Sequence, residues 1–122
     1  MDAKVIAAAE AAFPASTNSI TLGAVVHNNE CNPQPTISLP LSMMNRHGLI
    51  AGATGTGKTK TLQLIAEQLS NAGVPVFLAD VKGDVSGIAA AGDVSDRTTQ
   101  RAKETGYNWR AAAAPVEFLS LS

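Results

Sequence analysis

Residues 47–80 read HGLIAGATGTGKTKTLQLIAEQLSNAGVPVFLAD, and the pattern of this stretch decides the fold class that we expect. A short apolar run at 49–51 leads into a glycine-rich turn. Over residues 58–71, apolar side chains repeat at helical spacing, which predicts an amphipathic helix, and Gly73 stands where helices commonly end. The continuous apolar run at 74–79 is typical of a parallel strand covered on both faces. The order strand, loop, helix, strand predicts an α/β fold with a right-handed crossover.

The glycine-rich turn, GATGTGKT at residues 52–59, matches the phosphate-loop pattern G-x-x-x-x-G-K-[ST] at every fixed position. Glycines let a backbone wrap closely around a phosphate and adopt positive φ angles, and the N–H groups at a helix N-terminus bind anions. Lys58 would bridge the β- and γ-phosphates, and the Thr59 hydroxyl would bind Mg²⁺. A chance glycine turn with a solvent-facing lysine is the alternative, and the predicted flanking strand and helix argue against it. We therefore expect a site for ATP and Mg²⁺ formed by Gly52, Ala53, Thr54, Gly55, Thr56, Gly57, Lys58 and Thr59.

The first 40 residues have a different character. The sequence predicts an alanine-rich helix over 3–13, a strand over 20–26, a polar loop over 27–35 and a short strand over 36–39. We expect residues 1–40 to form this helix and a small β-rich lead-in rather than an independent domain.

Residues 41–122 are expected to form part of a P-loop NTPase domain, a three-layer sandwich with a mostly parallel sheet. The run at 115–121 is a third predicted strand, besides those at 49–51 and 75–80, and residues 95–105 are a predicted surface helix. Because a P-loop sheet usually has about five strands, we expect the chain to be the N-terminal part of a longer protein.

Residues 36–92, and most specifically residues 45–87, resemble the N-terminal part of the bacterial HerA-like ATPases, in the HerA–FtsK superfamily. The resemblance rests on Asn-Arg-His-Gly at 45–48, on the loop at 52–59, and on Asp-Val-Lys-Gly-Asp at 80–84. It implies an oligomeric, hexameric ATPase that couples hydrolysis to movement on DNA. It also places the Walker B acid, the catalytic glutamate and a trans-acting arginine beyond Ser122. Lys58 is then the one catalytic residue expected here, and we expect the isolated chain not to hydrolyse ATP.

Asp80 has two possible roles. An apolar run that ends in aspartate has the shape of a Walker B strand, in which the carboxylate holds Mg²⁺ through water. The resemblance instead implies a supporting position at the crevice where strands of an open α/β sheet end. Lys82 and Asp84 contact nucleotide or a neighbouring subunit, or they are solvated loop charges.

Three functions are consistent with these features. The first is an ATPase motor segment of the HerA type. The second is a small-molecule kinase or GTPase with Asp80 as the direct Walker B residue, although the guanine-reading N-K-x-D motif is absent. The third is a non-hydrolytic module for nucleotide binding or oligomerisation.

The amino-acid composition indicates which kinds of partner and which location to expect. The formal net charge of −1 gives no sign of a basic nucleic-acid surface, so DNA as a partner rests on the resemblance alone. Cys31 is the only cysteine, which excludes an internal disulfide and favours a cytoplasmic location. No stretch approaches the roughly 20 apolar residues that span a bilayer, so we expect no membrane partner.

The remaining candidates are weaker. His27, Cys31 and His47 match no standard metal-ligand spacing. An arginine finger could lie among the arginines of the last third of the chain, but a solvated face is favoured. Two aromatic residues of that region could stack on a base, but packing is favoured. The arginines are Arg97, Arg101 and Arg110, and the aromatic residues are Tyr107 and Trp109.

Overall fold

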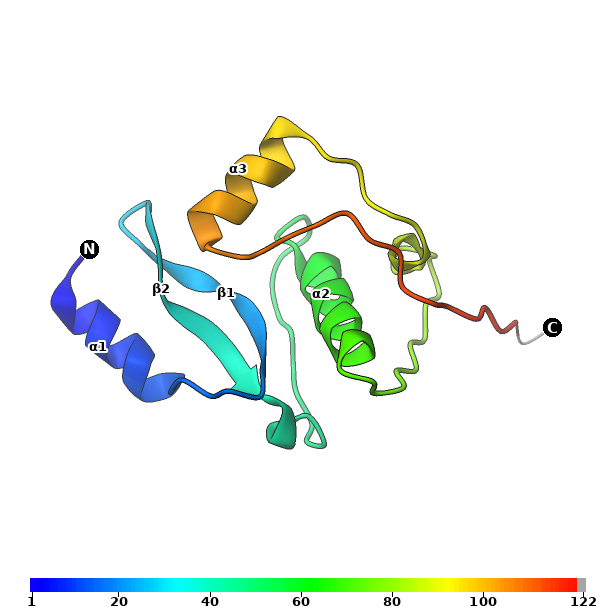
Figure 1. Cartoon of the computed structure of the whole chain (residues 1–122), viewed down its shortest axis with the longest axis horizontal. Helices are drawn as coiled ribbons and strands as arrows, with labels where there is room; N and C mark the ends of the chain where they lie inside the picture. The colour runs from blue at the N-terminus through cyan, green and yellow to red at the C-terminus, as the bar shows by residue number, and fades with distance from the viewer. Residues whose placement is uncertain (121–122) are drawn as a thin grey trace.

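A computed structural model describes residues 1–120 of the chain (Figure 1). In this part of the chain, three α-helices surround one two-stranded antiparallel sheet. The elements in order are α1 (Ala3–Ala12), β1 (Ser19–His27), β2 (Glu30–Pro40), the 3₁₀ turn η1 (Leu41–Met43), α2 (Lys58–Asn71), the 3₁₀ turn η2 (Ser86–Ala89) and α3 (Asp96–Thr105).

The strands β1 and β2 form a hairpin closed by a two-residue turn. Asn28 and Asn29 have φ angles of 50° and 62°, and positive values at both central residues are typical of the type I′ turn that suits the twist of a hairpin. The loop predicted over 27–35 is therefore wrong, because β2 already begins at Glu30. Its two prolines are tolerated because each strand of a two-stranded sheet has an edge without a ladder.

The helices follow the sequence pattern closely. The bounds of α2 are those predicted, and Gly73, at φ 80°, closes it. Two hydrogen bonds define this ending: the Val74 N–H donates to the Leu69 carbonyl at 2.9 Å, and the Gly73 N–H donates to the Ser70 carbonyl at 2.9 Å. This is the Schellman arrangement, which satisfies the last helical carbonyls.

A small core joins α2 to the hairpin. The buried apolar side chains are those of Ile20, Val25, Ala66 and Val85, and Ile20 retains only 1% of its exposure. The Gln68 carboxamide of α2 also accepts from the Thr21 N–H at 2.7 Å and donates to the Thr21 carbonyl at 2.8 Å. The helix that begins at the glycine-rich loop is thereby fixed against β1.

The predicted parallel sheet is absent from residues 1–120. No strand forms over 49–51, 75–80 or 115–120, and residue 121 lies outside the described residues. Apolar side chains in these segments are exposed, with Leu49 at 90%, Phe77 at 84% and Leu119 at 82%. A strand exists only where a neighbour accepts its hydrogen bonds, and the one ladder of the described residues joins β1 to β2. The fold is therefore a small α/β domain built on an antiparallel hairpin, not a P-loop sandwich.

Beyond α3, residues 107–120 run back past α2, as Figure 1 shows, and we call them the returning segment. One backbone hydrogen bond holds this returning segment, from the Ala114 N–H to the Ile88 carbonyl of η2 at 3.0 Å. This bond joins the returning segment to η2, beside α2.

Candidate functional site

The glycine-rich loop needs its glycines for two different reasons. Gly55 and Gly57 have φ angles of 79° and 97°, a region that side chains with a Cβ rarely adopt. At Gly52 the constraint is space, because a Cβ would lie 2.6 Å from the Thr56 hydroxyl oxygen. That hydroxyl donates to the Ala53 carbonyl at 2.7 Å and so closes the loop on itself. The positive φ angles predicted from the sequence are confirmed at two of the three glycines.

The N-terminus of α2 differs from those of the other two α-helices. Asp2 caps α1 by accepting from the Lys4 N–H at 2.9 Å, and Ser95 caps α3 by accepting from the Thr98 N–H at 3.2 Å. Gly57 begins α2 with no side-chain cap. The first N–H groups of a helix have no intrahelical acceptor, and together with the helix dipole they favour an anion. The loop therefore presents uncapped N–H donors where the sequence pattern predicts phosphate.

Lys58 is the first residue of α2 and reaches back over the loop. Its ammonium group donates to the Ala53 carbonyl at 2.7 Å. An ammonium carries three donors, so this bond places the positive charge at the loop without using all of them. A depression of about 250 Å³ lies here, lined by Gly55, Gly57, Lys58, Thr59 and Lys60. The structure thus brings the predicted lysine, threonine and two glycines to one surface.

Asp80 holds the backbone of the loop that follows it. Its carboxylate accepts from the N–H groups of Gly83 at 2.8 Å, Asp84 at 3.2 Å and Val85 at 2.9 Å. The hydrogen bond from Val85 is the largest of the effects that lower the pKa of this carboxyl group below its ordinary value. The Asp80 carboxylate is therefore already bound by backbone donors, and its role as a Mg²⁺ ligand stays a prediction.

The loop after Asp80 is also attached to α2. The Gln63 side-chain amide donates to the Asp84 carbonyl at 3.1 Å, and the Lys60 ammonium donates to the Gln63 carboxamide oxygen at 3.1 Å. A chain of polar contacts therefore leads from Lys60, which lines the depression beside Lys58, to the loop that Asp80 orders. The side chain of Lys82 is exposed in this loop.

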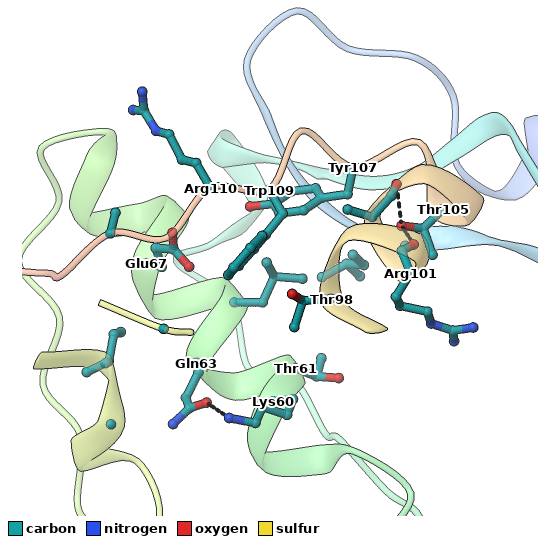
Figure 2. A pocket seen from close by; sticks show the side chains of 18 of the residues that line it. Lys60, Thr61, Gln63, Glu67, Thr98, Arg101, Thr105, Tyr107, Trp109 and Arg110 are labelled. Atoms are coloured by element: carbon teal, nitrogen blue, oxygen red, sulfur yellow. Dashed lines mark hydrogen bonds between the residues drawn. The ribbon is translucent and has the colours of Figure 1, made fainter. Parts of the chain in front are cut away.

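A second and larger hollow lies along α2. This groove has a volume of about 800 Å³ and lies between β1, α2, α3 and the returning segment (Figure 2). Tyr107 and Trp109 extend into it from the returning segment, above the α2 residues Gln63 and Glu67. Burial, and to a smaller extent the Glu67 carboxylate, raises the pKa of the Tyr107 hydroxyl. The sequence favours packing over base stacking for this aromatic pair and gives no sign of the groove.

The other sequence candidates are not assembled into sites. Among residues 1–120, no group of three or more His, Cys, Asp or Glu side chains is placed to hold a metal ion, so His27, Cys31 and His47 do not form such a group. The Cys31 thiol instead donates to the Glu104 carbonyl at 3.3 Å. Arg101 forms an exposed ion pair with Glu104 at 3.7 Å. Arg101 and Arg110 line the groove and Arg97 does not.

None of the helices in residues 1–120 is both long enough and apolar enough to span a bilayer.

Comparison with known proteins identifies one family. The family model described as helicase HerA-like C-terminal matches residues 26–122, a range that contains the glycine-rich loop, Asp80 and the aromatic pair. This match confirms the resemblance that the sequence indicated. No curated protein and no solved structure matches the chain.

Proposed function

The chain belongs to the helicase HerA-like C-terminal family, and from this premise we propose that residues 52–59 bind the phosphates of Mg-ATP. Membership makes the chain a HerA-family, ATPase-related domain. The proposal adds the ligand and the residues that hold it.

One observation carries the proposal: α2 begins at a glycine with no side-chain cap, whereas α1 and α3 are capped. A capping side chain would compete with phosphate for the first N–H groups of the helix. At α2, two loop glycines and Lys58 line one depression, and the Lys58 ammonium lies at the same loop. Positive charge and backbone donors without a capping acceptor favour a phosphate.

The residues of the site then have separate roles. Lys58 contacts the terminal phosphates as a point charge, since its ammonium already lies at the loop. Thr59 supplies a hydroxyl oxygen, a ligand type that Mg²⁺ prefers, and ATP and water supply the rest. Asp80 acts on Mg²⁺ through water rather than directly, because three backbone N–H groups occupy its carboxylate.

For the whole protein, the proposal is ATP-driven movement on DNA by an oligomer. The support for it is the helicase family itself and the resemblance to HerA-like ATPases. The acids and the arginine needed for hydrolysis lie, by this resemblance, after Ser122. The part of the reaction proposed for this chain is therefore phosphate binding, with Lys58 as the residue that also stabilises the developing charge.

The test is a titration with fluorescent ATP and GTP analogues, with and without Mg²⁺. Lys58→Ala removes the charge at the loop, and Lys103→Ala removes a charge from the last turn of α3 as a matched control. A charge-assisted contact contributes about 1.5–3 kcal/mol, so Lys58→Ala should weaken ATP binding by more than about tenfold. The parent and Lys103→Ala should bind ATP saturably, with Mg²⁺ strengthening the binding. Equal affinities for the two variants, each shown to be folded by circular dichroism, would contradict the proposal.

A further inference from the structure

The groove and the depression beside Lys58 have one lining residue in common. Lys60, in the first turn of α2, lines both of them, and the groove continues from there along Thr61, Leu64 and Glu67. A ligand whose phosphates lie at residues 52–59 therefore has a second, larger hollow next to it, bordered by Lys60, for the rest of its structure. The groove volume of about 800 Å³ lies within the roughly 300–1,000 Å³ that small-molecule sites occupy.

The lining of the groove suits a flat heterocycle. Trp109 is half-buried and lines the groove, and Tyr107 lies beside it (Figure 2). Aromatic rings hold bases by stacking, which tolerates any base because every base has a π-face. The Leu64 side chain adds an apolar wall, and the Glu67 carboxylate can accept a hydrogen bond from an exocyclic amine.

We propose that the base and ribose of the bound nucleotide enter this groove and that the base stacks on Trp109. The inference rests on the proposed function, because it takes the phosphates to lie at residues 52–59. It assigns the returning segment a ligand-binding role, although this segment lies about 50 residues along the chain from the phosphate loop.

Trp109 is the only tryptophan of the chain, so intrinsic fluorescence reports on this position alone. The ligands are Mg-ATP and Mg-tripolyphosphate, and the latter carries phosphates without a base. We expect ATP to quench the Trp109 emission saturably, after correction for absorbance by the nucleotide. Tripolyphosphate should displace a fluorescent ATP analogue without quenching Trp109. In Lys58→Ala, both the quenching by ATP and the displacement by tripolyphosphate should be lost.

Two substitutions separate stacking from packing. Trp109→Ala should weaken ATP binding about tenfold, as expected for the loss of one stacked base, and should leave the affinity for tripolyphosphate unchanged. Trp109→Phe keeps an aromatic face and should retain ATP affinity within about threefold. Because it fills most of the same space, it also serves if Trp109→Ala fails to fold.

The contrary outcomes are distinct. ATP binding that depends on Lys58 but leaves Trp109 emission unchanged would overturn the base site and keep the phosphate site. An equal loss of ATP and tripolyphosphate in Trp109→Phe or Trp109→Ala would make Trp109 a packing residue and would also overturn it. Binding of neither ligand to the folded parent would remove the phosphate site and the inference with it. Quenching by a short oligonucleotide, but not by ATP, would assign the groove to nucleic acid instead.

Discussion

Replacing Gln68 by alanine tests how the phosphate-loop helix is fixed to the rest of the fold. The Gln68 carboxamide exchanges two hydrogen bonds with the backbone of Thr21, at 2.7 and 2.8 Å, and a third, at 3.1 Å, with the Leu64 carbonyl of its own helix. The two contacts to Thr21 join α2 to β1 in a partly buried position. Gln68→Ala removes both and leaves a backbone donor and acceptor of the strand without these partners.

The expected loss follows from these two bonds. At about 1 kcal/mol each, Gln68→Ala should lower the free energy of unfolding by about 2 kcal/mol, a large share for a domain with a small core. Urea unfolding followed by circular dichroism measures it. With a slope of about 1.3 kcal/mol per molar urea, the midpoint should fall by about 1.5 M.

Gln100→Ala is the matched control, since Gln100 lies exposed on α3 and donates to the Glu104 carboxylate at 2.9 Å. A helical pair of this kind contributes about 0.2–0.5 kcal/mol, so its midpoint should move by less than about 0.5 M. Equal midpoints for Gln68→Ala and Gln100→Ala would refute the reasoning that the carboxamide anchors α2 to the hairpin.

Two further predictions concern the loop and Asp80. Gly57→Ala places a Cβ at φ 97°, and the resulting strain of about 1 kcal/mol should lower the Tm by about 5 °C. Gly48→Ala is the control, because Gly48 lies in open space without a positive φ, and it should leave the Tm unchanged. Thermal unfolding compares the two variants, and equal shifts in Tm would argue against the left-handed turn. The folded-state pKa of Asp80 lies below its ordinary value of 3.8, so its carboxylate stabilises the fold above about pH 4, and that contribution is lost as the pH falls through the lowered pKa. Asp80→Asn should therefore be less stable than the parent at pH 7 and should lose less stability on acidification, while the exposed control Asp93→Asn should follow the parent. Unfolding curves at pH 7 and pH 3 measure these stabilities. An equal loss of stability at pH 3 in the parent and in Asp80→Asn would contradict the prediction.

The sequence predicts α2 and its loop well because the signals there are local. The helical repeat, the glycines and Gly73 each act within a few residues, and the structure reproduces the helix bounds and the positive φ angles at Gly55 and Gly57. The turn at Asn28 and Asn29 is equally local, but the polar residues and two prolines of residues 27–35 predict a longer loop in its place.

The parallel sheet was predicted wrongly for a different reason. An apolar run shows that a segment favours burial, but it does not show which neighbour would accept its hydrogen bonds. Phe77 is apolar and yet 84% exposed, since no ladder forms around it in residues 1–120. The groove could not be predicted for a related reason: it is lined by several segments, most of them far apart in the sequence, and Trp109 gives no local sign of facing α2.

The most direct test of the central claim is an amide NMR spectrum of the chain, recorded during titration with Mg-ATP. If the uncapped N-terminus of α2 holds the phosphates, the largest shifts should occur at the N–H groups of Gly55, Gly57, Lys58 and Thr59. They should be absent when Lys58→Ala is titrated over the same range. Saturable ATP binding that leaves these N–H signals unmoved, with the shifts elsewhere in the chain, would contradict the account.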